Sequence, residues 1–233
     1  MPITLGDGER ASAPSGPAVH YRGLMPAPIT PQGQTTLHRF TIKPGHVDQY
    51  LPILDQEIAL AGEHGFVTHR VFVETNAEPR VSWLYSHPDP LVGQVRLAQD
   101  ERHRDLVEAK QGHIFRNLLV RPVEVEAMTT LEPGDAEGRI AILRRYSIVG
   151  DWDDFLGFWR RIAPLRERHG FRVLFAVTDR PRDLFTWAFD FAGTWEQFPA
   201  AQAEYYADPE RAELRSVFDH MADYLISPAR MLH

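Results

Sequence analysis

The sequence predicts an α+β protein built from two copies of one β-α-β-β-α-β unit, and three observations support this prediction. The first is a pair of similar segments, LHRFTI at 37–42 and LRRYSI at 143–148. The second is the tripeptide His-Gly-Phe, which occurs at 64–66 and again at 169–171. The third is a tryptophan that follows each tripeptide at nearly the same distance. Because all three features recur at almost one offset, we infer an internal duplication. The matched residues are Arg39 and Arg145, His64 and His169, and Trp83 and Trp187.

Each copy has the same predicted order of elements. A short strand rich in β-branched and aromatic residues comes first, and a helix then runs to the His-Gly pair. Two strands joined by a hairpin-like connector follow, and a helical stretch and a last short strand complete the unit. The predicted strands are 36–42, 66–73, 81–86 and 119–127 in copy one, and 140–148, 171–178, 184–190 and 225–232 in copy two.

The first helix of each copy is predicted from apolar residues that recur every three or four positions. Asp48 and Asp151 lie near the helix starts, where a carboxylate satisfies free N–H groups. The His-Gly pairs at 64–65 and 169–170 lie at the helix ends, where histidine caps carbonyls and glycine accepts a positive φ. The last helix of copy two is expected to run over 208–224. The apolar residues of the first helix in copy two are Trp152, Phe155, Leu156, Trp159, Ile162 and Leu165.

The chain divides into four predicted segments. Residues 1–34 are rich in Pro, Gly, Ser and Ala and are expected to form a flexible N-terminal arm, which could also cover a partner subunit or a pocket mouth. The first repeat spans 35–131, a polar, turn-rich linker spans 132–138, and the second repeat spans 139–233.

Composition excludes several classes of function. The formal net charge of -7 argues against a general affinity for nucleic acid. The chain contains no cysteine, which excludes disulfides, thiolate nucleophiles and Cys-based metal sites. No stretch approaches the roughly 18 apolar residues of a membrane span. The N-terminus lacks a basic start followed by an apolar stretch, so we expect a cytoplasmic protein.

The predicted unit follows the ferredoxin-like plan, in which helices cover one face of a four-stranded antiparallel sheet. The other face is apolar and needs a partner. In a tandem duplication that partner is the other copy, so we expect the two sheets to enclose a barrel-like interior within one chain. Because edge strands and apolar helices often associate, we also expect a homodimer.

Four segments carry a resemblance to a known family: LRRYSI at 143–148, HGF at 169–171, FTWAFDF at 185–191 and ADPERAELRS at 207–216. In this order and spacing they resemble the NIPSNAP-like family of the dimeric α+β barrel superfamily. The resemblance covers about 34–233 and is weaker in copy one. It implies a dimeric α+β barrel fold. It leaves the activity open, because that superfamily includes cofactor-free monooxygenases, cyclases, isomerases, haem enzymes and proteins without known catalysis.

Strand alternation selects candidate ligand-binding residues. Arg39 and Arg145 fall on the less aromatic face of the first strand of each copy, so we expect both to point into the barrel. A buried guanidinium needs an anionic partner, which is either a neighbouring carboxylate of the chain or the carboxylate or enolate of a ligand. We expect the ligand pocket to lie inside the barrel, with Trp83 and Trp187 beside the two arginines as an aromatic wall; the alternative for the tryptophans is a role in the core. Tyr146 is a candidate for a phenol hydrogen bond to the ligand.

The candidate catalytic residues are His69, His38 and Tyr85. Neither histidine recurs in copy two, where Arg144 and Leu174 occupy the matching places. Such asymmetry is expected when only one copy retains chemistry; the alternative for each is a histidine that is solvated or satisfied in the core. A histidine is a candidate general base because its ordinary pKa lies near neutrality, and a tyrosine supplies a phenol. Because His38 and Arg39 are adjacent on a strand and should face opposite sides, His69 is the stronger candidate.

The sequence contains no motif typical of nucleotide, flavin or zinc binding, so no cofactor and no metal are expected. With the reactions of the superfamily that the sequence resembles, this favours a small cofactor-independent enzyme, a cyclase, isomerase or monooxygenase, acting on an aromatic or polyketide-like metabolite of bacterial secondary metabolism. One alternative is a non-catalytic ligand-binding or protein-interaction module. A second alternative is a haem-binding barrel protein with a histidine as axial ligand. The expected partner is an aromatic or anionic small molecule, not nucleic acid or a membrane.

Overall fold

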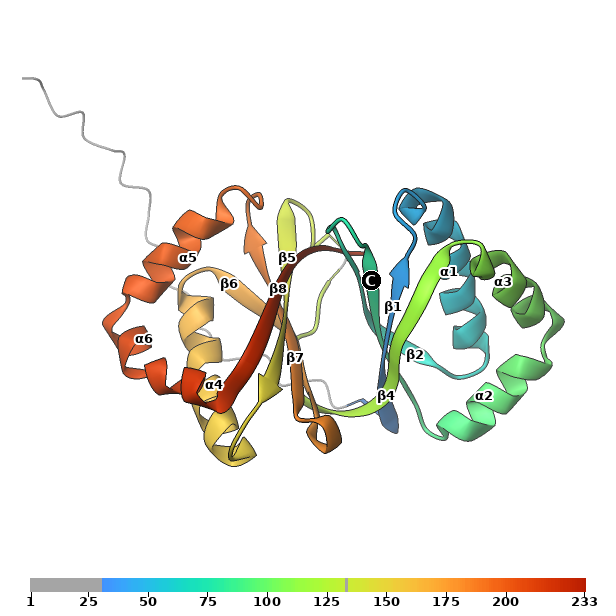
Figure 1. Cartoon of the computed structure of the whole chain (residues 1–233). Coiled ribbons are helices and arrows are strands. Elements are labelled where there is room, and N and C mark those ends of the chain that lie inside the picture. Colours follow the sequence, from blue (N-terminus) through green and yellow to red (C-terminus); the bar gives the residue numbers. More distant parts are fainter. Residues whose placement is uncertain (1–30, 133) are drawn as a thin grey trace, which may run out of the picture.

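The computed structural model describes residues 31–132 and 134–233, in which strands occupy the middle and helices the two ends (Figure 1). The strands are β1 (Gln34–Ile42), β2 (Val67–Glu74), β3 (Arg80–His87), β4 (Ile114–Met128), β5 (Arg139–Ile148), β6 (Phe171–Asp179), β7 (Leu184–Ala192) and β8 (Met221–Met231). The helices are α1 (Val47–Glu63), α2 (Pro90–Gln99), α3 (Glu101–Gln111), α4 (Trp152–Arg168), α5 (Phe198–Ala207) and α6 (Pro209–Glu213), with the 3-10 helices η1 (Arg180–Arg182) and η2 (Arg215–His220). Among the described residues, no helix is both long and apolar enough to cross a membrane.

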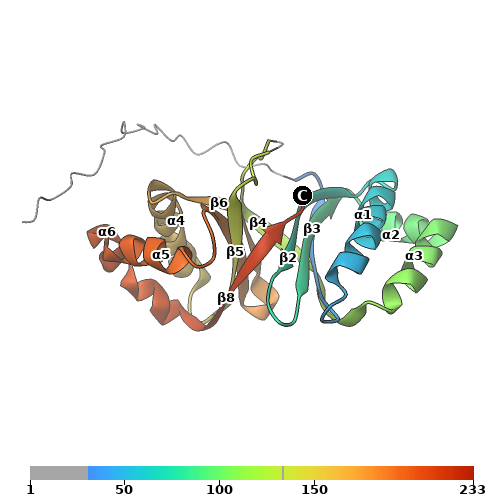
Figure 2. The ribbon, with the colours of Figure 1, turned by 90° about the horizontal axis from the view of Figure 1, so that it is seen from above.

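The described strands close into one antiparallel barrel in the order β1-β3-β2-β8-β5-β7-β6-β4. Within each half the order is that of the ferredoxin-like plan, β4-β1-β3-β2 and β6-β7-β5-β8. The halves join at two short seams, β2 with β8 and β4 with β6. Figure 2 shows the helices of each half outside its own sheet. The predicted fold class, two ferredoxin-like sheets packed as a barrel within one chain, is confirmed.

Three hydrophobic cores follow from this arrangement. The first fills the barrel and includes Leu37, Phe72, Leu143, Phe175 and Ala188. The second lies between the first sheet and its helices and contains Phe40, Tyr50, Leu54, Val71 and Trp83. The third is the largest, lies between the second sheet and its helices, and is rich in aromatic residues. Its aromatic members include Tyr146, Phe155, Trp159, Phe171, Phe185, Trp187, Phe189, Phe198 and Tyr205.

The repeated histidines cap the first helix of each half and anchor a second helix to it. His64 and His169 are the C-cap residues of α1 and α4, and the glycine that follows each has a positive φ. The ring Nε2 of His64 lies 3.1 Å from the carboxylate of Asp100, and that of His169 lies 2.8 Å from Asp208. Asp100 and Asp208 are themselves the N-caps of α3 and α6. The same contact between a C-cap histidine and an N-cap aspartate therefore stabilises both halves.

Several boundaries differ from the prediction. The helix expected over 208–224 ends earlier, because Met221 already pairs with Ile148 and begins β8. The predicted strand 119–127 belongs to a longer strand, β4, which begins at Ile114 where that residue pairs with Ile42. The predicted linker lies between β4 and β5. Of the predicted N-terminal arm, residues 1–30 lie outside the described residues, and Gln34 is already part of β1.

Candidate functional site

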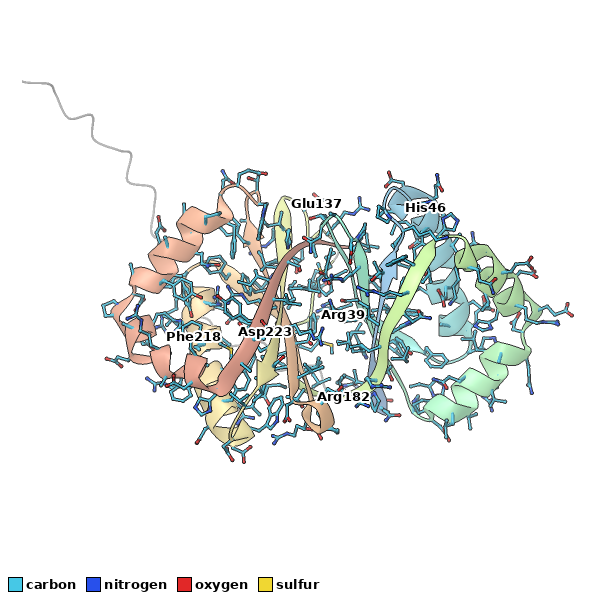
Figure 3. The ribbon with its side chains drawn as sticks, viewed as in Figure 1. Arg39, His46, Glu137, Arg182, Phe218 and Asp223 are labelled. Carbon is cyan, nitrogen blue, oxygen red and sulfur yellow. The ribbon has the colours of Figure 1, made fainter. Side chains whose placement is uncertain are left out.

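The predicted site residues do not meet in one place. Arg39 is on β1 and Arg145 is on β5, the first strand of each half, and both side chains are on the barrel face, as expected. Arg39 lies between the two sheets (Figure 3). There its Nη2 donates to the buried carboxylate of Glu74 at 2.5 Å and its Nε donates to Ser82 at 3.0 Å. The guanidinium of Arg39 is thus neutralised by the chain itself, which is the structural alternative that the sequence left open.

Arg145 is half-buried and lines a cavity on the barrel side of the sheets. Arg39, Glu74, Arg80 and Thr186 also line this cavity, which contains about 250 Å³ of space, its open mouth included. Burial, together with the charges of Arg39 and Arg80, lowers the pKa of Arg145. A role of Arg145 in ligand binding remains a prediction.

The tryptophans point away from the barrel, so the prediction that they line its interior is wrong. Trp83 is paired across the sheet with His38 and packs in the core of the first half, where its Nε1 donates to Thr68 at 3.0 Å. Trp187 is paired with Arg144 and packs in the core of the second half. The reason is the register: Arg39 faces Ser82, so its neighbour Trp83 must take the opposite face.

The candidate bases of the first half are poorly suited to proton transfer. Burial lowers the pKa of His38 to about 4, and its ring lies against Phe40 and Trp83. Burial and the charge of Glu57 raise the pKa of Tyr85 to about 12. A histidine with so low a pKa is a weak base, and a phenol with so high a pKa remains protonated at neutral pH.

His69 lies at an irregularity of the β2–β3 pairing, where the register shifts between Thr68 and Arg70. Its Nε2 lies 2.8 Å from the hydroxyl of Ser86, and burial and the charge of Arg70 lower its pKa. His69 is therefore near the barrel face of the first sheet, apart from both Trp83 and the cavity beside Arg145.

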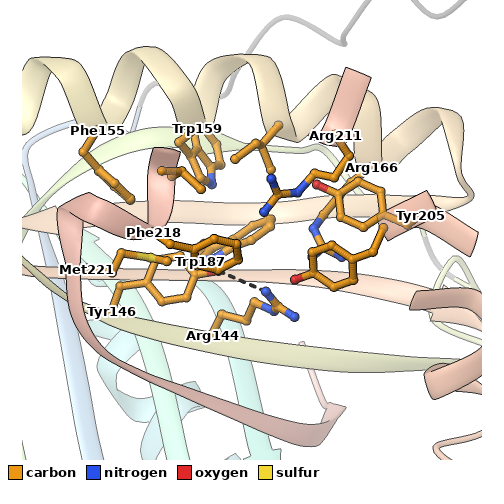
Figure 4. Close-up of a pocket in the computed structure, with 13 residues that line it drawn as sticks. Arg144, Tyr146, Phe155, Trp159, Arg166, Trp187, Tyr205, Arg211, Phe218 and Met221 are labelled. Carbon is orange, nitrogen blue, oxygen red and sulfur yellow. Dashed lines mark hydrogen bonds between the residues drawn. The ribbon is translucent and has the colours of Figure 1, made fainter. Parts of the chain in front are cut away.

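A pocket in the second half brings together residues that were not predicted to lie close to one another. It lies between the sheet and the helices and contains about 320 Å³ of space, its open mouth included (Figure 4). Three arginines from three elements converge on it: Arg144 from β5, Arg166 from α4 and Arg211 from α6. Their exposed fractions are only 5%, 1% and 4%. The other lining residues are Tyr146, Phe155, Trp159, Ile162, Trp187, Tyr205, Tyr206, Val217, Phe218 and Met221.

Aromatic rings and neutral groups, not carboxylates, surround these three guanidinium groups. Arg144 donates to the hydroxyl of Tyr146 and to the amide oxygen of Gln202, each at 3.2 Å. Arg166 lies over the ring of Tyr205, 4.2 Å from its centroid. Within the described residues, no carboxylate oxygen lies within 4.0 Å of a nitrogen of these three arginines.

Several buried polar atoms of the pocket have no hydrogen-bond partner among the described residues. They include Nε and Nη1 of Arg166, Nε and Nη1 of Arg211, and the hydroxyl of Tyr205. A buried charge without a partner is costly, and buried donors without acceptors add to that cost. The arrangement is thus complementary to an anion that the chain does not itself supply.

The charges of the pocket shift the pKa values of its members in opposite directions. Burial, reinforced by the charge of Arg144, lowers the pKa of Arg166 to about 10. Burial raises the pKa of Tyr205. Burial works in the same direction on Tyr206, but the nearby charges of Arg144 and Arg166 outweigh it and lower the pKa of Tyr206.

The corresponding core of the first half is built differently. At the places of Arg144 and Arg166 it has His38 and Ala61. Its buried carboxylate, Glu57, lies 2.5 Å from the ammonium group of Lys110. The two halves therefore differ, and among the described residues the three buried arginines without a carboxylate partner lie in the second half.

Two of the predicted site residues, Tyr146 and Trp187, line this pocket. The three arginines were not predicted as site residues. Arg166 had a signal in the sequence, because it continues the apolar face of its helix after Trp159 and Ile162 at helical spacing. Arg211 had none, since it lies on a short helix whose packing only the tertiary structure determines.

The residues of the pocket do not fit a histidine-ligated haem. An axial ligand would have to come from the lining residues, and no histidine is among them. His169 lies behind the ring of Tyr205 and already contacts Asp208.

Comparison with known proteins identifies the fold. No family model matches the chain. No curated protein matches it either. Among solved structures, a proposed monooxygenase from Fusobacterium nucleatum has a TM-score of 0.60 at 11% identity, covering 86% of this chain and 92% of the other.

Two further structures have the same fold. An anthrone oxidase-like protein has a TM-score of 0.58 at 13% identity, covering 87% of this chain and 92% of the other. A proposed chlorite dismutase has a TM-score of 0.52 at 11% identity, covering 87% of this chain and 96% of the other. Together with the closed barrel of the described strands, these similarities place the chain in the dimeric α+β barrel fold, with both sheets supplied by one polypeptide.

Proposed function

We propose that this protein binds an anionic aromatic small molecule in the pocket between the second sheet and its helices, and acts on it as a small cofactor-independent enzyme. One observation carries the proposal. Three buried guanidinium groups face one cavity, and among the described residues none of them has a carboxylate partner. A ligand carboxylate or enolate supplies the missing charge.

The chemistry of the walls favours an aromatic ligand. Seven of the thirteen lining residues are aromatic, among them Trp159, Trp187 and Phe155. Such surfaces recognise flat apolar groups, while the few polar groups fix their orientation. In the structure described, the pocket is narrow and has room for a water molecule or a small anion. A larger ligand requires movement of the half-exposed side chains at the mouth, Tyr206 and Phe218.

A cyclase, isomerase or monooxygenase of this kind needs a proton acceptor and stabilisation of an oxyanion, and the pocket contains both types of group. Phenols of Tyr146, Tyr205 and Tyr206 lie beside the arginines. The related folds of a proposed monooxygenase and an anthrone oxidase-like protein agree with this reaction class. A NIPSNAP-type relationship remains part of the proposal.

The experiment compares two probes that differ in one charged group. Phenylpyruvate is an aromatic keto acid, and phenylacetone has the same ring and ketone without the carboxylate. Calorimetric titration is expected to show binding of phenylpyruvate and none of phenylacetone. Arg144→Gln and Arg166→Gln should each weaken phenylpyruvate binding by about tenfold or more, since a charge-assisted hydrogen bond contributes about 1.5–3 kcal/mol.

Arg160→Gln is the matched control. Arg160 is on the same helix, α4, but it is exposed and pairs with Glu126 at 2.6 Å. Its replacement should leave the affinity unchanged. Equal binding of both probes, or equal effects of Arg160→Gln and Arg166→Gln, would contradict the proposal.

The non-catalytic alternative predicts the same binding without turnover of any aromatic keto acid. The haem alternative is tested by the visible absorption spectrum of the purified protein after addition of haem. A Soret band that shifts on binding and survives Arg144→Gln would favour it over an anionic aromatic ligand.

A further inference from the structure

We propose that Tyr206 is the proton acceptor of this pocket and removes a proton from the carbon next to the carbonyl of a bound aromatic keto acid, while the arginines hold the enolate that forms. This inference rests on the proposed function and deepens it. It assigns a catalytic residue and a substrate class, a carbon acid that carries both a carboxylate and an aromatic ring.

Tyr206 occupies the position that this role requires. It lies in the last turn of α5 and lines the pocket, with an exposed fraction of 37%. It therefore borders both the cavity and solvent, so that a proton taken from a ligand has a route to water. The guanidinium carbon of Arg211 lies 5.2 Å from the centroid of the Tyr206 ring.

Three arginines and a second phenol lie close to Tyr206. Arg144 of β5 and Arg166 of α4 line the same pocket and act on its phenol through their charges. Arg211 of α6 lies over its ring, and the ring of Tyr205 is 5.1 Å away. The lining contains no carboxylate that would oppose ionisation of the phenol.

The two adjacent tyrosines differ in the way that this assignment requires. For Tyr205, burial dominates and raises the pKa of its phenol. For Tyr206, burial is outweighed by the charges of Arg144 and Arg166, and its pKa is lowered. A lowered pKa increases the fraction of phenolate near neutral pH, and the phenolate is the form that accepts a proton.

The proposed step balances without an oxidant or a metal. The C–H bond next to the carbonyl breaks, and its proton passes to the phenolate oxygen of Tyr206. The electron pair of that bond forms a carbon–carbon double bond, and the carbonyl oxygen becomes an enolate oxygen held by a guanidinium group. Return of the proton to the enolate oxygen gives the enol, and return to carbon regenerates the ketone. The net reaction is a tautomerisation.

The first test measures ionisation of Tyr206 directly. The ultraviolet band of tyrosinate is followed as the pH of the ligand-free protein is raised. One phenol should titrate below the ordinary value of about 10, and this phase should disappear in Tyr206→Phe. Tyr224→Phe is the control, since Tyr224 lies on β8 with an exposed fraction of 55% and does not line the pocket. A low-pH phase that survives Tyr206→Phe, or no such phase in the wild type, would overturn the assignment.

The second test follows proton transfer on phenylpyruvate. Deuterium exchange at the benzylic carbon is measured by nuclear magnetic resonance in heavy water, after subtraction of the uncatalysed rate. Wild-type protein should accelerate exchange, and Tyr206→Phe should reduce the acceleration by about 100-fold or more, as expected for loss of a general base. Tyr224→Phe should exchange at the wild-type rate.

The outcomes separate this inference from the proposed function. Phenylpyruvate that binds the wild-type protein without accelerated exchange overturns the role of Tyr206 and leaves the binding pocket intact. Phenylpyruvate that fails to bind contradicts the proposed function and removes the inference with it. Tyr206→Phe that binds phenylpyruvate normally but loses both exchange and the low-pH phenol supports the inference.

Discussion

Replacing Arg166 by methionine is expected to stabilise the ligand-free protein and to weaken its affinity for an anionic ligand. The Arg166 side chain is 1% exposed, and among the described residues it has no carboxylate partner. Methionine keeps most of the volume and the contacts with the surrounding rings, but it places no charge in the pocket. Removal of a buried charge that lacks a partner relieves its desolvation penalty.

The magnitude follows from the pKa of Arg166. Burial lowers that pKa from 12.5 to about 10, which corresponds to a penalty of about 3 kcal/mol for holding the charge in the pocket. Against this, the guanidinium carbon lies 4.2 Å from the Tyr205 centroid and 4.5 Å from that of Phe189. Because these rings share one charge, together they offset about 2 kcal/mol of this penalty when desolvated. The net gain in the free energy of unfolding is therefore about 1 kcal/mol, or a rise in Tm of about 2–4 °C.

Arg39→Met is the matched control with the opposite expected sign. Arg39 is also buried, but it pairs with the buried carboxylate of Glu74. Without Arg39, the nearest cation to Glu74 among the described residues is Arg80, whose nitrogen is 3.7 Å from its carboxylate. Removing one partner of a buried pair costs about 3–5 kcal/mol, so this variant should unfold more readily.

The assay is denaturant unfolding of both variants and the wild type in a buffer without phosphate or carboxylate, followed by the intrinsic fluorescence of tryptophan. The midpoint should rise for Arg166→Met and fall for Arg39→Met. Addition of phenylpyruvate should raise the midpoint of the wild type more than that of Arg166→Met. Loss of stability in Arg166→Met similar to that in Arg39→Met would refute the reasoning, because it would mean that the chain itself compensates the charge of Arg166.

Three further predictions concern other parts of the molecule. Arg145→Ala tests the barrel cavity: calorimetry should show an unchanged affinity for phenylpyruvate if the ligand binds beside Arg166, whereas a tenfold loss would place it in the barrel, as the sequence suggested. Contact with His169 and a backbone N–H lowers the pKa of Asp208, so this aspartate stabilises the fold above its ordinary pKa of about 4, and that contribution is lost as the pH falls; Asp208→Asn should flatten the loss of thermal stability in acid, and an unchanged acid profile would contradict this. The chain is expected to form a homodimer, which light scattering at low concentration tests; a mass of 26.6 kDa would show a monomer.

Much of the fold could be predicted because its signals are local or repeated. The strands alternate, the first helices have a regular apolar spacing, and the His-Gly pairs mark the same helix ends in both copies. The barrel could be predicted because each sheet has an apolar face without helices, and the two faces cover each other. The end of the last helix was missed because η2 gives way to β8 at Met221, where pairing with β5 outweighs helical preference.

The site was harder to predict because it depends on register and on distant packing. Alternation placed Arg39 correctly, but the face of Trp83 depends on its pairing opposite His38, which the sequence does not specify. His38 was predicted to be functional because it does not recur in copy two, and Arg144, which occupies the matching place there, was not considered. Arg144, Arg166 and Arg211 come from three elements, so only the tertiary structure brings them together.

A crystal structure of the protein grown with phenylpyruvate tests the central claim most directly. We predict density for phenylpyruvate between the second sheet and α4. The carboxylate of the ligand should lie within hydrogen-bond distance of Arg144 or Arg166, and its ring should lie against Trp159 or Trp187. Density for the ligand in the barrel beside Arg145, or a carboxylate of the chain itself bound to Arg166, would contradict it.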